Sequence, residues 1–191
     1  MEQSVKVALW TAVIVGIANL IVKIMEIKLN HKYQRKKLKL EKQMSINESV
    51  EEKAQLFIMS ADKIAKAAKE FCDVNKRNLN GSMPNIQANK YSLQAVDDLN
   101  EGMEKTFSEI TSIKLIMTDS SYKNKIIYNL EKVRSICEKI ASITIQVESN
   151  KEQLEYIEKK ELEIKEEIKF LQNYVDKSIS MINCYINEDL K

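Results

Sequence analysis

The chain has very little of the two residue types that interrupt helices. Among its 191 residues there are one proline and three glycines. Few sharp turns can form without them, so long uninterrupted helices are expected. Aromatic residues make up only 6% of the chain and charged residues 30%, a composition typical of amphipathic helices and not of sheets. The sequence therefore predicts an all-α protein.

The residue types that carry out catalysis or bind metals are also scarce. His31, in a basic stretch, is the only histidine, so no Cys-His or Ser-His dyad and no bundle-core metal site is expected. The three isolated glycines form no phosphate-binding loop. Cys72, Cys137 and Cys184 are scattered among apolar helix positions, which favours reduced, buried thiols over a disulfide framework. We expect neither an enzyme nor a cofactor or metal site.

One long apolar run lies near the N-terminus, where residues 7–22 are sixteen residues without a charge. Lys6 and Lys23 can extend their amines to the two interfaces, which lengthens the span to about residues 5–25. A cleaved signal peptide would end in a small-x-small site, whereas this run ends in LIVKIMEIK. We expect a single transmembrane helix over residues 1–25. A buried core helix is the alternative.

A basic block follows the run and predicts its orientation. Residues 23–42 carry eight Lys or Arg against two Glu, and only Lys6 precedes the span. Lys and Arg beside a span stay in the cytoplasm. The sequence predicts a single-pass protein of the cell membrane, with its N-terminus outside and its C-terminus cytoplasmic, and a basic juxtamembrane helix over residues 26–48. The predicted contacts with the inner leaflet are Lys28, Lys32, Arg35, Lys36, Lys37, Lys39 and Lys42.

The block has more than one interpretation. Its cations would attract anionic headgroups of the inner leaflet, or serve only as a topology signal. Nucleic acid is a weaker third partner, because the block adjoins the membrane and only Tyr33 offers stacking.

Within the span, small residues recur at every fourth position, and an amide side chain continues the same face of the helix one turn later. This pattern predicts self-association of the span, or arises by chance. Its residues are Ala8, Ala12, Gly16 and Asn19.

Heptad spacing predicts an antiparallel helical bundle or coiled coil over residues 49–191. No Gly or Pro interrupts residues 17–80, so the anchor is expected to continue as one helix into the bundle. The sequence NLNGSMPN at residues 78–85 must end that helix, and TDSS at residues 118–121 supplies N-caps for another reversal. Four apolar seams result. The first comprises Val50, Ala54, Phe57, Ala61, Ile64, Ala68 and Phe71. The second comprises Leu93, Val96, Leu99, Met103, Phe107, Ile110 and Ile113. The third comprises Ile126, Leu130, Val133, Cys137, Ile140, Thr144 and Val147. The fourth comprises Ile157, Ile164, Ile168, Leu171, Val175, Ser178 and Ile182.

The third and fourth seams are out of phase, and ESNKEQ at residues 148–153 between them is wholly polar. A turn near Ser149 or Asn150 gives four cytoplasmic helices and is favoured. A continuous helix gives three, one of them roughly 100 Å long.

These features predict a membrane-anchored helical scaffold, adaptor or assembly protein that presents helical faces at the inner membrane surface. Its expected partners are the anionic inner leaflet, a second copy of the chain and an unidentified protein. The alternative function is an oligomeric membrane-active protein of the pore-forming or effector kind. A further alternative is an external envelope tether with reversed topology.

Overall fold

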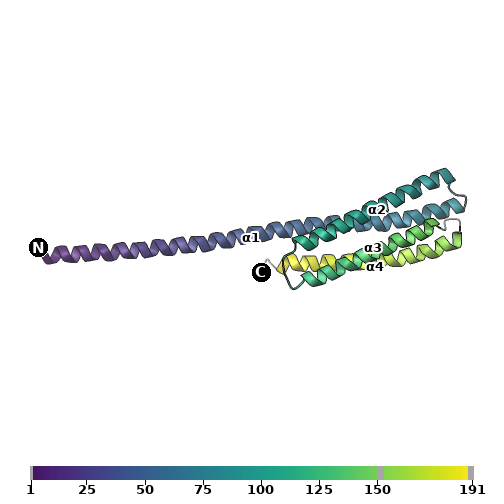
Figure 1. Ribbon diagram of the computed structural model, residues 1–191. Helices are drawn as coiled ribbons and strands as arrows, with labels where there is room; N and C mark the ends of the chain where they lie inside the picture. Colours follow the sequence, from purple (N-terminus) through teal and green to yellow (C-terminus); the bar gives the residue numbers. More distant parts are fainter. Residues whose placement is uncertain (1, 150–152, 189–191) are drawn as a thin grey trace. The chain divides into compact units, whose positions relative to one another are not determined.

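A computed structural model describes the backbone of residues 2–149 and 153–188, and the side chains of residues 20–149 and 153–188. Over these residues the chain has four helices and no strand (Figure 1). The helices are α1 (Glu2–Leu79), α2 (Asn85–Ile116), α3 (Lys123–Ser149) and α4 (Leu154–Glu188). The prediction of an all-α protein is confirmed. The chain divides into two compact units, Met1–Ser45 and Ile46–Lys191.

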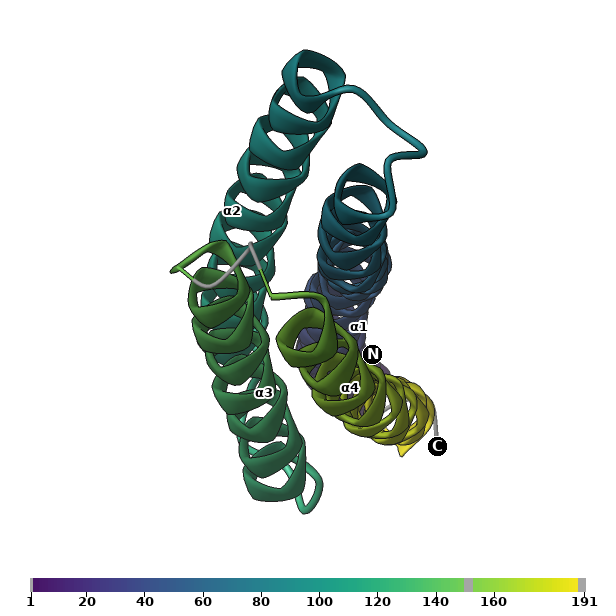
Figure 2. The ribbon, with the colours of Figure 1, turned by 90° about the vertical axis from the view of Figure 1, so that its right-hand side faces the viewer.

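The second unit is a four-helix bundle in which consecutive helices run antiparallel. Viewed end-on, α1, α2, α3 and α4 follow one another around a ring (Figure 2). An ion pair crosses each of the four interfaces between neighbours: Lys63–Glu101, Lys114–Glu131, Lys139–Glu167 and Lys76–Glu161. The favoured arrangement of four helices is confirmed, because α3 ends at Ser149 and α4 begins at Leu154. Ser149 does not cap α4, since its Oγ donates back to the carbonyl oxygen of Ile145 at 3.0 Å. Asn150 lies outside the described residues.

Where side chains are described, no helix is both long and apolar enough to cross a membrane. The predicted span of residues 5–25 falls mostly on residues 1–19, whose side chains lie outside that description.

Three of the four predicted seams form the core of the bundle. Every predicted seam residue of α1, α3 and α4 is buried. Phe57, Phe71 and Tyr185 are the largest of the fully buried side chains. Tyr185 follows the fourth seam by three residues, so the seam extends beyond the predicted range. The heptad pattern located these faces because burial of a periodic apolar stripe is the main force that holds such helices together.

The predicted seam of α2 is partly wrong. Leu93 is 67% exposed, and Val96, Met103 and Phe107 are only partly buried. The buried face is offset toward smaller residues, which are Ala88, Ser92, Ala95, Gly102 and Thr106, together with Leu99, Ile110 and Ile113.

The cause of the offset is the close approach of α1 to α2. A Cβ atom on Gly102 would lie 2.9 Å from Cγ1 of Ile64 and 3.3 Å from the carbonyl oxygen of Ser60. Large side chains do not fit at so short a separation. The pattern of large apolar residues therefore predicted a face that is right at Leu99, Ile110 and Ile113 and wrong at Leu93.

The predicted reversals are found. α1 ends at Leu79, and the amide of Ser82 donates to the carbonyl oxygen of Arg77 at 2.9 Å. Gly81 has a φ of 69°, which a residue with a side chain rarely adopts. At the next reversal, Oγ of Ser120 accepts a hydrogen bond from the amide of Tyr122 at 3.2 Å, one residue before α3 begins.

Candidate functional site

The candidate site is the basic segment of α1. All seven cations predicted to contact the inner leaflet are exposed. Lys28, Lys32, Arg35, Lys39 and Lys42 recur at steps of four, three, four and three, so at 3.6 residues per turn they lie on one face of the helix. Lys36 flanks this row, and the six together are named the basic face. A single helix with no break carries all of them.

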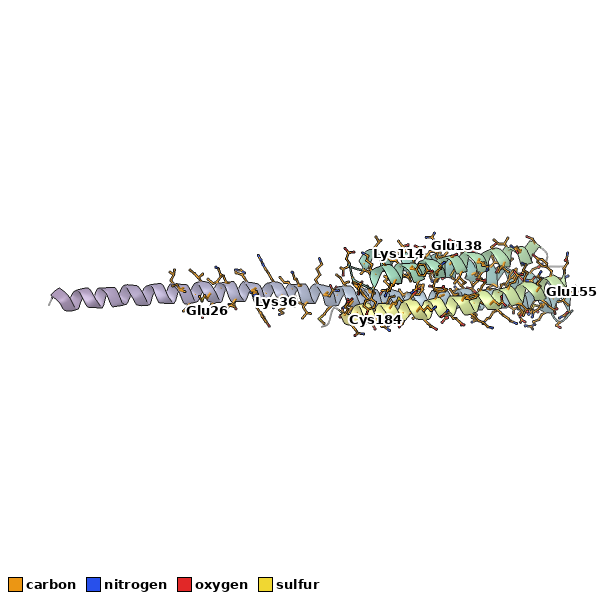
Figure 3. The ribbon with its side chains drawn as sticks, turned by 90° about the horizontal axis from the view of Figure 1, so that it is seen from below. Glu26, Lys36, Lys114, Glu138, Glu155 and Cys184 are labelled. Atoms are coloured by element: carbon orange, nitrogen blue, oxygen red, sulfur yellow. The ribbon has the colours of Figure 1, made fainter. Side chains whose placement is uncertain are left out.

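The opposite face of the same segment is close to neutral. Lys37 lies there and forms an ion pair with Glu41, with 3.8 Å between Nζ and Oε1. Glu26 lies three turns earlier on the same side as Lys37 (Figure 3 labels Glu26 and Lys36). Lys37 therefore lies on a different side of the helix from the other six, and its predicted contact with the inner leaflet stays a prediction. The segregation of charge gives the helix one side that attracts anions.

An exposed apolar row lies beside the basic face. Leu29, Tyr33, Leu40 and Met44 are 65%, 71%, 52% and 48% exposed. The predicted first seam begins at Val50 and therefore does not include this row. Steps of seven back from Val50 and Ala54 reach Leu29, Leu40 and Tyr33, so the sequence did contain the signal.

The residues predicted to associate within the membrane, Ala8, Ala12, Gly16 and Asn19, have side chains outside the described part of the chain. The structure therefore neither places them nor brings them together. That prediction stays a prediction.

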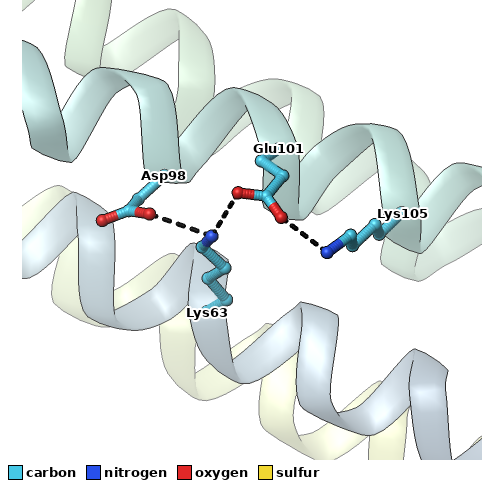
Figure 4. A network of polar contacts seen from close by, with 4 residues as sticks. All are labelled: Lys63, Asp98, Glu101 and Lys105. Carbon is cyan, nitrogen blue, oxygen red and sulfur yellow. Dashed lines mark hydrogen bonds and ion pairs between the residues drawn. The ribbon is translucent and has the colours of Figure 1, made fainter.

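The bundle carries an ion-pair network between α1 and α2 (Figure 4). Nζ of Lys63 lies 2.6 Å from Glu101 and 2.9 Å from Asp98, and Lys105 lies 2.5 Å from the other oxygen of Glu101. The hydrogen bonds from Lys105 and Lys63 lower the pKa of Glu101 to about 2. Hydrogen bonds to Glu101 and Asp98 raise the pKa of Lys63. The network lies on the surface and links α1 to α2.

Two of the three cysteines are buried in the bundle, as predicted, but the third is not. Burial raises the pKa of the Cys72 and Cys137 thiols to about 12, so neither is a nucleophile at neutral pH. Cys184 is exposed on α4, contrary to the prediction (Figure 3). The position has apolar neighbours in sequence, but α4 turns it to the outside.

One hollow of the bundle is lined by charges of both signs. It has a volume of about 650 Å³, lies near the turn between α1 and α2, and is lined by Lys66, Lys69, Arg77 and Lys165 but also by Glu70, Asp73 and Glu161. Among the residues whose side chains are placed, no group of three or more His, Cys, Asp or Glu is arranged to hold a metal ion. The predictions that the chain is no enzyme and has no cofactor stay predictions.

Comparison with known proteins adds no family to this picture. No protein-family model matches the chain, and no curated protein or solved structure is significantly similar to it.

Proposed function

We propose that the protein is a single-pass, membrane-anchored helical scaffold whose bundle works at the inner membrane surface. The observation that carries this proposal is the order of features along α1. An uncharged run at residues 7–22 is followed in the same helix by six cations on one face. An apolar helix flanked on one side by Lys and Arg is the arrangement that holds a membrane span with that side in the cytoplasm.

The first cations of the basic face serve the membrane directly. Lys28 and Lys32 follow the predicted span by one to two turns and contact anionic headgroups, each worth about 1 kcal/mol. They hold the start of the cytoplasmic segment at the inner leaflet. The anchor and these cations together keep the chain at one surface, which raises its effective concentration for partners there.

The bundle supplies a rigid body for this scaffold. Its core joins all four helices, from Val50 and Phe57 in α1 to Ile182 and Tyr185 in α4. Ion pairs and buried hydrogen bonds also join its helices, such as Lys63–Glu101 and Thr106–Ser60 between α1 and α2. A scaffold of this kind acts by position, so it needs no reactive group.

Topology tests the proposal, and the chain carries its own reporter. Cys184 is exposed, whereas Cys72 and Cys137 are buried thiols that react slowly at neutral pH. We expect a membrane-impermeant maleimide to label Cys184 only after lysis of the cells. The Cys184→Ser chain is the control and should stay unlabelled under both conditions. Ser180→Cys in that background places a second reporter on the exposed side of α4.

Labelling of Cys184 on intact cells would reverse the orientation and make the protein an external tether. Release of the chain from membranes by alkaline carbonate would remove the anchor altogether, because a spanning helix resists that extraction.

A further inference from the structure

The basic face is too long for the membrane surface alone. A helix rises about 1.5 Å per residue, so Lys39 and Lys42 lie roughly 20 to 25 Å beyond the end of the predicted span at residue 25. Surface charges are screened beyond about 8 Å at physiological salt. By the same rise, Lys28 lies about 5 Å and Lys32 about 10 Å beyond that end. The membrane surface therefore attracts Lys28 most strongly and leaves the later cations, from Lys32 on, able to bind another partner.

Leu29, Tyr33 and Leu40 of the apolar row continue the first seam of the bundle in heptad register, and the polar Lys36, Gln43 and Asn47 occupy the remaining seam positions before Val50. Val50, Ala54 and Phe57 are 0%, 6% and 0% exposed because other helices cover them. Leu29, Tyr33 and Leu40 occupy the same register positions, yet they are 52% to 71% exposed. A seam of this kind is the packing face of a coiled coil. Its register places Lys32 and Lys39 directly beside the seam, at g positions, and Lys28 and Lys42 farther around the helix, at c positions.

A second copy of the chain does not suit this seam. In a parallel pair, Lys36 would meet its own counterpart at a core position, and Lys32 would face Lys37 of the other copy. An antiparallel pair would bring Lys32 opposite Lys39 of the other copy. Like charges at these positions repel each other, so the pairing of two copies of the chain through this seam is unfavourable.

We propose that residues 29–44 of α1 dock an acidic amphipathic helix of another protein. The partner helix would lay an apolar stripe on Leu29, Tyr33 and Leu40, and acidic residues along its edge would pair with Lys32, Lys36 and Lys39. Charge complementarity suits any anionic partner, and the shared register of the apolar row favours this occupant over nucleic acid, which would use the cations but leave that row exposed. The inference rests on the proposed scaffold function, because it names the chemistry of the partner that the scaffold holds.

A synthetic helix tests the inference without an identified partner. The probe has Leu at its a and d positions and Glu at its e and g positions, and the control probe has Lys in place of Glu. Fluorescence anisotropy measures their binding to the full chain in bilayers of neutral phosphatidylcholine, where no anionic lipid competes. We expect the acidic probe to bind at least about tenfold more tightly than the basic one.

Two matched pairs of charge reversals distinguish docking of a helix along the seam from non-specific attraction of an anionic peptide to the cations. Lys32→Glu with Lys39→Glu changes positions beside the seam, and Lys28→Glu with Lys42→Glu changes the same charge away from it. The first pair should weaken binding of the acidic probe about tenfold, and the second by less than about threefold. Equal losses would overturn the inference, because they would mean that any polyanion suffices.

The apolar row has its own test. Leu29→Ser with Leu40→Ser keeps every charge and changes only exposed side chains outside the bundle, so the helical content should not change. Binding of the acidic probe should fall about tenfold. Unchanged binding would overturn the inference and identify a polyanion site. Because this assay does not depend on orientation, its failure leaves the labelling of Cys184 to decide the anchor independently.

Discussion

At the scale of single residues, small side chains decide how α1 meets α2. Thr106 is fully buried, and its hydroxyl donates to Oγ of Ser60 at 2.8 Å. Ser60 in turn donates to the carbonyl oxygen of Phe57 at 3.0 Å. Gly102 lies one turn from Thr106 against Ile64. These residues allow the two backbones to approach closely and satisfy the polar groups that the approach buries.

Gly102→Ala should destabilise the bundle. The added methyl would meet Cγ1 of Ile64 at 2.9 Å and backbone atoms at 3.3 Å. Overpacking of this kind costs about 1 to 3 kcal/mol, and the better helix propensity of Ala returns up to about 1. We expect a net loss of about 1 to 2 kcal/mol in the free energy of unfolding of residues 46–191, measured by urea denaturation. Asn100→Ala, on the exposed side of α2, is the control. A stabilised Gly102→Ala bundle would show that the helices can separate at no cost.

Removal of Lys105 should raise the pKa of Glu101 more than removal of Lys63. Lys105→Gln removes the larger cause of its lowered pKa and should raise that pKa from about 2 toward the ordinary 4.5, and Lys63→Gln should raise it less. Carbon NMR of the side-chain carboxyl measures both shifts. In the unchanged bundle, the unfolded chain binds more protons than the folded one between about pH 2 and 4.5. The contribution of Glu101 to stability is therefore complete above pH 4.5 and is lost as the pH falls toward 2. A Glu101 that titrates near 4.5 in the unchanged bundle would mean that the network does not form in solution.

At the scale of elements, one side chain ties a connection to a helix that is distant in sequence. Tyr185 in α4 is fully buried, and its hydroxyl accepts a hydrogen bond from the amide of Thr118 at 3.2 Å. The same hydroxyl lies 3.1 Å from Oγ1 of Thr118. Close by, Oγ of Ser121 donates to the carboxylate of Glu188 at 3.1 Å. The connection between α2 and α3 is thus held against the end of α4.

Tyr185→Phe should loosen this connection without opening a cavity. The ring stays, but the amide of Thr118 loses its acceptor, so we expect a loss of about 1 to 2 kcal/mol in the free energy of unfolding. Hydrogen exchange at the amide of Thr118 should accelerate, while exchange in the middle of α3 changes less. Tyr128→Phe removes a hydroxyl from a ring that is 58% exposed and should alter neither quantity. Equal effects of the two substitutions would show that the hydroxyl of Tyr185 makes no special contact.

At the scale of the whole molecule, the distribution of charge matters more than its sum. The formal net charge is only +2, yet residues 23–42 alone carry eight cations against two carboxylates. The proposed orientation depends on this asymmetry, because cytoplasmic retention follows the Lys and Arg near a span and not the net charge of the protein.

Replacement of all seven cations from Lys28 to Lys42 by Gln should therefore disturb the topology. Lys23 would then be the only cation left just after the run, against Lys6 before it. We expect a mixed population in which a fraction of Cys184 is labelled on intact cells. The control is Glu48→Gln with Glu51→Gln and Glu52→Gln, which removes a cluster of charges from the same helix. Cys184 should stay protected in this variant, since carboxylates contribute little to the orientation of a membrane span. Full protection after loss of the seven cations would mean that another signal fixes the orientation.

The sequence by itself determined the helical class, the places where the chain reverses and the buried faces of α1, α3 and α4. Scarcity of Gly and Pro and heptads of large apolar residues are local properties, and they act before any helix meets another. The cations of the candidate site could also be identified from the sequence, as could the apolar row beside them once the heptads were traced backward. Only the tertiary structure decided the buried face of α2, the exposure of Cys184 and the contact of Tyr185 with Thr118. The buried face of α2 depends on how closely α1 approaches it, which small residues such as Gly102 permit. The other two depend on which side of α4 faces its neighbours and on how the connection between α2 and α3 lies against it.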